Sequence, residues 1–445
     1  MSSGAPMSSV AAQSCAVCAP VGSKRISRRA VLKGAGAVGA ITVAMPGWGG
    51  VAFASNEANR IGDIIVNIFL RGGMDGLSVV APLHAGAGAD LLAIARPTLN
   101  IDPSRLIPLN ADCGLHPMMA ALMPIWGAGT LALIPAAGFP NGDRSHFAVQ
   151  RKMDEGLDNG AVGSGWLARH LDNTFSAGPT GLRAASMPNG QRSMSGSSVA
   201  VTMNSTDTFR VDGFRNNANS GAAVRAALRE LNGVSGGNLV NQRAQEALVA
   251  LDVVSSAPSS PPANGAVYPT TGSGRNVGRV LSEIAELIRA DVGLEAVATE
   301  ANFGWDLHDN FGDDTTGRQA QNLEALAGVL AAFAQDLGSN MDRVTVVLMT
   351  EFGRTFRENG GFGVDHGRAS TMFVMGGGVR GGLYGDWPGL EAQNIDGNAL
   401  RVTVDYRAVL ADILEHRLAT GNMAAALLGY VDTPEKRLNL AVPLG

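Results

Sequence analysis

The feature of this chain that most constrains its fold is the alternation of short, β-branched apolar runs with longer amphipathic segments. Residues 63–70 and 343–349 have the length and composition of buried strands. Residues 318–337 repeat Leu and Phe at helical spacing, which indicates a helix with one apolar face. We expect further strands at 131–134, 294–298 and 371–375, and further helices at 147–157, 279–290 and 405–417. This alternation predicts an α/β fold: a doubly wound, mostly parallel sheet with helices on both faces.

Residues 1–54 have the pattern of a cleavable export signal. Basic residues precede a Gly- and Ala-rich apolar run, and Ala52 and Ala54 provide the small residues that a signal peptidase requires. The run Ser27–Lys33 carries the paired arginines of a twin-arginine signal. We therefore expect the twin-arginine translocase to export the folded chain, and cleavage after Ala54 to leave a periplasmic or secreted protein without a stable membrane anchor. An uncleaved anchor is the alternative, which Pro46 disfavours.

Charge and cysteine content exclude other classes of protein. The chain has 34 basic and 39 acidic residues, and its net charge of −5 excludes a strongly basic nucleic-acid binder. Cys15 and Cys18 lie in the export signal, so the mature chain keeps only Cys113 and forms no intramolecular disulfide. Residues 55–445 are expected to form a single domain with a loop-rich insertion at about 176–265, which holds weaker strands and a surface helix near 222–231.

Acidic residues and histidines follow the ends of the expected strands. Asp75 follows the first strand, and Glu351 ends a later one. Asp306 and His308 come after the strand expected at 294–298. Ligands of open α/β sheets bind beyond the carboxyl ends of the strands, so we expect these side chains at one rim. Carboxylates and imidazoles at such a rim favour one or two divalent cations, drawn from Zn, Mn, Mg and Ca.

Two loops add further polar residues to this set. Ser145 and His146 precede the helix expected at 147–157, and Asp365 and His366 precede the strand expected at 371–375. Ser145 at a helix start could act as a cap, which is compatible with a role as a nucleophile at the same position.

Each of these residues also has a structural interpretation. Asp75 follows two glycines and could simply fix its turn. Glu351 and Arg354 could form an ion pair with each other. The joint pattern is stronger support for a site than any single member.

Several motifs resemble those of the exported domain-of-unknown-function family fifteen-oh-one. The resemblance covers nearly all of the mature chain, in order, and is carried by the runs 70–76, 144–147, 304–308, 350–354, 365–367 and 376–382. That family is grouped with the alkaline phosphatase and sulfatase superfamily. The resemblance therefore implies a doubly wound sheet and a two-metal site that hydrolyses esters, whereas the family's own activity is not established.

The resemblance also implies roles for individual residues. It implies that Ser145 is the nucleophile. If the protein is active, we expect Arg71, Arg144 or Arg354 to bind the anionic oxygens of a small ester. The implied metal ligands are Asp75, Asp306, His308, Glu351 and His366, and the chain itself adds Asp365, an acid outside the superfamily pattern around which a second metal site is either rebuilt or lost. This chain departs from the superfamily pattern because Glu351 stands in place of an Asp and is followed by Phe352 rather than His.

Two functions follow from this comparison. The first is an exported, metal-dependent hydrolase that acts on phosphate or sulfate esters through a Ser nucleophile. The second is a non-catalytic exported binding or scaffold protein that keeps the fold with a degenerate metal site. Metal content and turnover by the mature protein distinguish the two.

Overall fold

The structure is a computed structural model that describes residues 62–174, 182–211, 218–232, 239–257, 259–313 and 315–444. The expected export signal at 1–54 lies outside these residues, so its assignment stays a prediction. Among the helices in the described ranges, none has the length and apolar character needed to cross a membrane.

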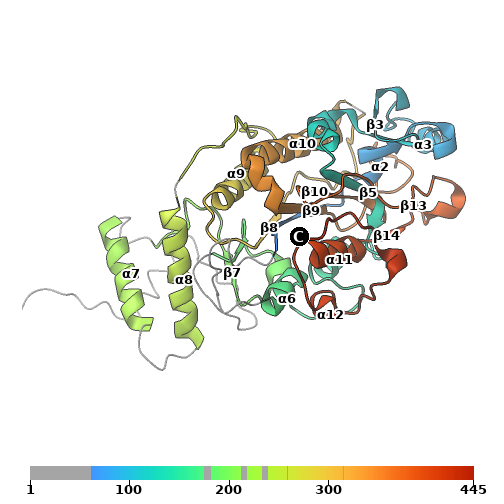
Figure 1. The fold of residues 1–445 in the computed structure, drawn as a ribbon. Helices are drawn as coiled ribbons and strands as arrows, with labels where there is room; N and C mark the ends of the chain where they lie inside the picture. Colours follow the sequence, from blue (N-terminus) through green and yellow to red (C-terminus); the bar gives the residue numbers. More distant parts are fainter. Residues whose placement is uncertain are drawn as a thin grey trace, which may run out of the picture. The chain divides into compact units, whose positions relative to one another are not determined.

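A central sheet organises this part of the chain (Figure 1). Strand β1 (Ile64–Phe69) pairs in parallel with β8 (Ala296–Glu300) on one side and β9 (Val344–Met349) on the other. Strand β10 (Ser370–Gly376) runs antiparallel between β9 and β5 (Leu131–Gly138). The strand order is β11-β5-β10-β9-β1-β8-β6-β7, with β14 beside β5. The outer strands are β6 (Ala184–Ser186), β7 (Ala200–Thr202), β11 (Gly382–Leu383) and β14 (Val404–Asp405).

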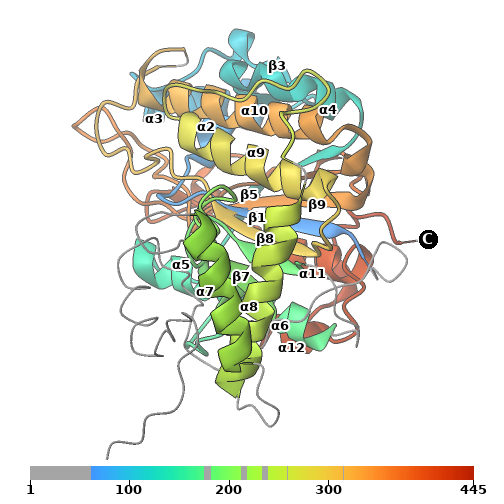
Figure 2. The ribbon, with the colours of Figure 1, turned by 90° about the vertical axis from the view of Figure 1, so that its left-hand side faces the viewer.

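Helices cover both faces of the sheet (Figure 2). Alternate residues of β1 point to opposite faces, as the pleat of a strand requires. Ile64, Val66 and Ile68 pack in the same apolar cluster as helices α9 (Arg275–Arg289) and α10 (Gly317–Leu337). Ile65 and Phe69 pack with helices α6 (Trp166–Asn173) and α11 (Tyr406–His416). The expected fold class, an α/β fold with a mostly parallel sheet between two helical layers, is confirmed.

Shorter elements complete the described part of the chain. Small sheets are formed by β2, β3 and β4, and by β12 and β13. Their bounds are β2 (Val80–Pro82), β3 (Ile107–Pro108), β4 (Cys113–Leu115), β12 (Ile395–Asp396) and β13 (Ala399–Leu400). The shorter helices are α2 (Gly76–Val79), α3 (Ala89–Ala95), α4 (Met123–Gly127), α5 (His146–Asp154) and α12 (Met423–Ala426).

The segment expected to be a loop-rich insertion contains two long helices. They are α7 (Ala218–Asn232) and α8 (Leu239–Ser256), of 15 and 18 residues. They contact each other, and Leu248, Leu251 and Val254 of α8 join the apolar cluster under α9. The frequent Ala, Leu, Arg and Gln residues of this segment explain the helices, since these residues lose little side-chain freedom in a helix.

Candidate metal centre

The parallel strands and the one reversed strand bring four loops to the same edge of the sheet. Strands β1, β8 and β9 are mutually parallel, so their carboxyl ends lie together. Strand β10 is antiparallel to β9, so its first residue lies at that edge and the loop that precedes it arrives there. His366 is in this preceding loop, and Asp306 and Glu351 follow β8 and β9. The topology thus collects residues that are far apart in the sequence.

Three histidines and one aspartate meet at this edge. The Nε2 atom of His366 lies 3.0 Å from that of His146 and 3.1 Å from that of His308. Asp306 Oδ1 lies 3.0 Å from His308 Nε2, 3.3 Å from His366 Nε2 and 3.4 Å from His146 Nε2. Ligand atoms about 2.0–2.1 Å from one zinc ion in tetrahedral geometry are about 3.3 Å apart. This spacing is matched by two overlapping sets of three ligand atoms, one from His146, Asp306 and His366 and the other from Asp306, His308 and His366. We call His146, Asp306, His308 and His366 the histidine cluster.

Each imidazole of the histidine cluster is oriented by an oxygen acceptor on its other nitrogen. His146 Nδ1 donates to Glu351 Oε1 at 2.6 Å, and His308 Nδ1 donates to Asp365 Oδ1 at 2.8 Å. His366 Nδ1 donates to the backbone oxygen of Arg144 at 2.9 Å. Such a bond fixes the ring and leaves Nε2 as the atom that can bind a metal.

In this orientation, lone pairs and a carboxylate face the centre of the histidine cluster, and no positively charged group of the described residues lies between them. A neutral imidazole that donates through Nδ1 has only a lone pair on Nε2. Three such lone pairs and the Asp306 carboxylate repel one another at about 3 Å unless a metal ion or protons lie between them. The imidazole-rich donor set therefore fits a divalent ion such as zinc. The side chains of Asp306 and His308 are 48% and 44% exposed, so the cluster is open to solvent on one side.

Glu351 lies behind His146 rather than at the centre of the cluster. It is fully buried, and its Oε1 atom also accepts hydrogen bonds from Gly72 N–H and from Gln150 Nε2. Burial by itself raises the pKa of Glu351, but the hydrogen bonds from His146 and Gln150 outweigh it and hold this pKa below its ordinary value. The same bond raises the pKa of His146. Asp365, which accepts from His308 and from Asn359, supports its histidine in the same way.

Arg354 holds Asp306 in place and is not exposed to a ligand. Its guanidinium is buried and donates to Asp306 Oδ1 at 2.8 Å. Its other donors bind backbone oxygens, among them those of Gly73 at 2.6 Å and Trp305 at 3.0 Å. Burial would raise the pKa of Asp306, but Arg354 lowers it to about 2, so the carboxylate is ionised at neutral pH. The ion pair between Glu351 and Arg354 that the sequence allowed is therefore not formed: Arg354 binds Asp306, and Glu351 binds His146.

Asp75 lies apart from the histidine cluster. Its carboxylate is fully buried and is bound by Arg96, with Nη1 to Oδ2 at 2.6 Å and Nη2 to Oδ1 at 3.0 Å. Ser78 donates a third hydrogen bond to it. Burial opposes ionisation, but Arg96 outweighs it and lowers the pKa of Asp75. The expectation that Asp75 is a metal ligand does not fit this arrangement, because both carboxylate oxygens are occupied by a buried ion pair.

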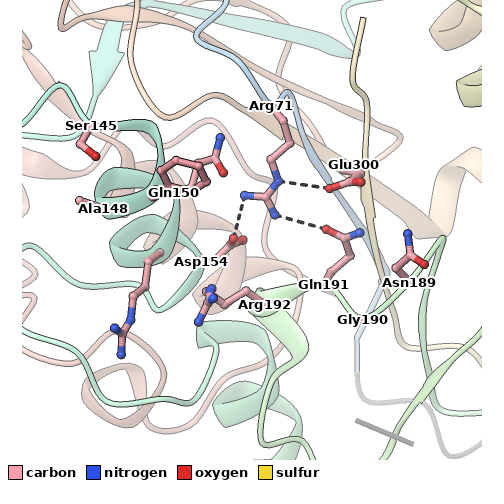
Figure 3. A pocket seen from close by; sticks show the side chains of 12 residues that line it. Arg71, Ser145, Ala148, Gln150, Asp154, Asn189, Gly190, Gln191, Arg192 and Glu300 are labelled. Atoms are coloured by element: carbon pink, nitrogen blue, oxygen red, sulfur yellow. Dashed lines mark hydrogen bonds and ion pairs between the residues drawn. The ribbon is translucent and has the colours of Figure 1, made fainter. Parts of the chain in front are cut away.

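The residues expected to act on the substrate have different surroundings. Ser145 occupies the N-cap position of α5, is exposed, and makes no capping bond through its hydroxyl. Arg144 donates to the backbone oxygens of His366, Asp396 and Gly397, so its guanidinium is engaged within the protein. Arg71 lines a cavity of about 810 Å³, and Ser145 lies on the wall of the same cavity (Figure 3).

Sequence reasoning placed His146 at the rim but did not include it among the metal ligands. The signal for it was its position directly after Ser145 at the start of a helix, beyond the end of a strand. Gln150 was not singled out, although it follows His146 by one helical turn and shares its acceptor, Glu351. Within the described residues, His146, Asp306 and His366 form a group of potential ligands whose atoms all lie within 4.8 Å of one another, and Asp306, His308 and His366 lie equally close together.

A family model described as "Protein of unknown function (DUF1501)" matches residues 114–417. The chain belongs to this family. The match includes the whole histidine cluster and Glu351, and it confirms the family that the sequence motifs indicated for residues 114–417, whereas the run 70–76 lies outside it. No curated protein matches the DUF1501 chain significantly.

Solved structures resemble the chain only weakly. The C-terminal periplasmic domain of EcEptC from Escherichia coli, in complex with Zn, has 9% identity and a TM-score of 0.35, over 88% of this chain and 92% of that one. Phosphoglycerol transferase GacH from Streptococcus pyogenes has 12% identity and a TM-score of 0.32, over 85% and 83%. Alkaline phosphatase from the Antarctic bacterium TAB5 has 10% identity and a TM-score of 0.27, over 71% and 92%. Because these TM-scores are low, the description of the fold rests on the sheet and helices of this chain and not on the solved structures.

Proposed function

We propose that the protein is an exported, metal-dependent hydrolase of phosphate or sulfate esters. The observation that carries the proposal is the convergence of three imidazole Nε2 atoms on the Asp306 carboxylate, with each Nδ1 atom bound to an oxygen acceptor. Metal-binding histidines in proteins share this arrangement. Imidazole nitrogens suit Zn more than Mg or Ca, which prefer oxygen ligands throughout. We therefore propose a site for one ion at the histidine cluster, in place of the larger site with six ligands that the sequence suggested.

A metal ion bound by His146, Asp306 and His366, with His308 beside Asp306 and His366, would supply Lewis acidity to an ester oxygen. The protein's own residues hold this cluster in position. Arg354 fixes the Asp306 carboxylate, and Glu351 fixes the ring of His146. The solvent-exposed side of the cluster leaves room for the phosphate or sulfate group.

Ser145 is the proposed nucleophile. Its hydroxyl is exposed, is not used as a helix cap, and belongs to the residue next to His146. Attack of Ser145 Oγ on phosphorus or sulfur forms one bond and releases the alcohol, and water then cleaves the covalent intermediate. The three arginines expected to bind the anionic oxygens are engaged within the protein. Arg144 and Arg354 bind backbone oxygens, and Arg71, which lines the cavity beside Ser145, is bound to Asp154, Glu300 and Gln191. The metal ion would therefore bind the anionic oxygens.

A non-catalytic binding protein with the same fold is the alternative. The observation in its favour is that the described residues contain one cluster of three or more potential ligands, whereas a two-metal ester hydrolase holds two ions about 4 Å apart. Asp75 is bound to Arg96 and does not contribute to a second site.

Turnover by metal-loaded protein tests the proposal. The purified protein is loaded with Zn or Mn and assayed with aryl phosphate, phosphodiester and aryl sulfate substrates. We expect turnover with at least one class, abolished by chelator and lowered at least a hundredfold by Ser145→Ala, with exposed Ser259→Ala as the matched control. Protein that binds one ion and hydrolyses none of the substrates would support the binding-protein alternative instead.

A further inference from the structure

A polar cavity lies beside the start of α5, and the proposed chemistry does not use most of it. Its volume is about 810 Å³, within the range of roughly 300–1,000 Å³ that is usual for small-molecule sites. Helix α5 forms one wall through residues that include Ser145, Phe147 and Asp154. Residues 189–192 form the opposite wall, and Arg71 projects between the two walls (Figure 3).

The charges in this cavity are balanced. Arg71 pairs with Asp154 at 2.9 Å and with Glu300 at 3.3 Å. Arg151 pairs with Glu155 at 2.9 Å, and Arg192 approaches the same carboxylate at 3.9 Å. Three guanidinium groups and two carboxylates, those of Asp154 and Glu300, thus line the cavity, and the buried Glu155 outside the lining pairs with the remaining positive charge. A free anion or cation would have to compete with these pairs, whereas an uncharged polar molecule would not.

The cavity also offers hydrogen-bonding groups and one apolar surface. Asp154 is 1% exposed, and its Oδ1 atom has no hydrogen-bond partner within the described residues. A buried acceptor of this kind requires a donor, and a ligand hydroxyl can supply one. Asn189 and Arg192 add amide and guanidinium groups on the opposite wall (Figure 3). Phe147 is 88% exposed although it lines the cavity, so its ring is available for stacking.

We infer that this cavity binds a neutral, hydroxyl-rich ring, such as a pyranose sugar. Adjacent hydroxyls of a sugar both donate and accept, which matches guanidinium, amide and carboxylate groups set close together. The C–H face of the ring packs on the Phe147 side chain. The inference deepens the proposed function, on which its final step rests: because Ser145, the proposed nucleophile, lines the cavity and directly precedes His146 in the chain, the sugar is the alcohol part of the ester.

Saturation-transfer NMR tests this binding site directly. The purified protein is mixed with the methyl glycosides of glucose, galactose, mannose and N-acetylglucosamine, with and without chelator. We expect transfer to the ring protons of at least one glycoside in both conditions. Phe147→Ala should raise its Kd at least tenfold, while Val267→Ala, an 81% exposed apolar residue that does not line the cavity, should leave it unchanged. Asp154→Asn, which removes the carboxylate from the cavity, should weaken binding in the same direction.

The possible outcomes separate this inference from the proposed function. The inference fails if no glycoside binds, if Phe147→Ala binds as tightly as the unchanged protein, or if inorganic sulfate displaces the sugar. Sugar binding by protein that hydrolyses no ester would uphold the cavity and reject the hydrolase. Ester turnover without glycoside binding would reject the cavity alone.

Discussion

His146 and Glu351 are 205 residues apart in the sequence, and a hydrogen bond of 2.6 Å joins His146 Nδ1 to Glu351 Oε1. The two residues are brought together because α5 begins and β9 ends at the same edge of the sheet. The bond determines which nitrogen of His146 faces the histidine cluster. It also gives Glu351, a buried acid at a strand end, a supporting role in place of direct ligation.

Glu351→Gln should weaken metal binding without unfolding the protein. The amide keeps the shape of the side chain but accepts a weaker hydrogen bond from His146, and loss of such a supporting acceptor typically costs about 10–100-fold in metal affinity. Competition with a chromogenic chelator measures the change. Glu391→Gln, at an exposed position away from the cluster, is the control and should bind as the unchanged protein does. Equal affinities for both variants would mean that Glu351 does not support the site.

His146→Ala should reduce bound metal from about one ion per chain to a small fraction of that value. The ring provides one of the ligand atoms that lie within 4.8 Å of one another, and the smaller side chain cannot replace it. Elemental analysis of dialysed protein measures the stoichiometry. His84→Ala is the matched control because His84 is half exposed and pairs with Asp112 away from this edge. Full metal content in His146→Ala would remove His146 from the ligand set.

Asp75→Asn should lower stability and leave metal content unchanged. The substitution leaves the Arg96 guanidinium buried without its charged partner, and breaking a buried pair in this way costs roughly 3–5 kcal/mol. Urea denaturation measures the free energy of unfolding, and elemental analysis measures the metal. A loss of metal with little change in stability would instead support the role of Asp75 as a ligand that the sequence suggested.

The stability of the protein should depend on pH through Asp154. Burial raises the pKa of Asp154 to about 6, well above the value of about 3.9 for an unfolded chain. The native state therefore holds this proton more tightly, and the resulting stabilisation is fully present below about pH 4 and is lost as the pH rises through about 6. The shift of about 2 units corresponds to roughly 3 kcal/mol.

The variant Asp154→Asn isolates this contribution. Its stability relative to the unchanged protein should increase by about 3 kcal/mol between pH 4 and pH 7, because Asn does not ionise. Urea denaturation at several pH values measures the difference. A constant difference between the two proteins across this range would show that the pKa of Asp154 is ordinary in the native state.

The sequence predicted most of the fold because buried strands and amphipathic helices leave strong local patterns. The strand expected at 343–349 is β9 with one residue fewer, and the helix expected at 318–337 is α10 with one residue more. The position of β10 between β5 and β9, and its reversed direction, depend on pairing between distant segments. No local pattern carries that information. Helix α7 contains the surface helix expected near 222–231, whereas α8 was hidden by the surrounding Gly, Ser and Asn residues.

The candidate site was predicted in outline but not in its internal arrangement. The rim position of Asp306, His308 and His366 followed from the strand ends, and the structure brings these three together. Which acids contact the centre depends on their partners, and these are not local. Arg96 binds Asp75, and His146 binds Glu351, so neither acid contacts the centre of the cluster. Both contacts join segments whose proximity no local sequence pattern shows.

Helix α5 carries His146, Gln150 and Asp154 at successive intervals of four residues, so these three side chains share one face of the helix. One added or deleted residue between His146 and Gln150 would rotate the following positions by about 100° around the helix axis. Such a change would turn Gln150 and Asp154 away from Glu351 and Arg71 together. The length of this segment is therefore under a stricter constraint than the identity of most of its residues, and natural variation in it should consist of substitutions without gaps.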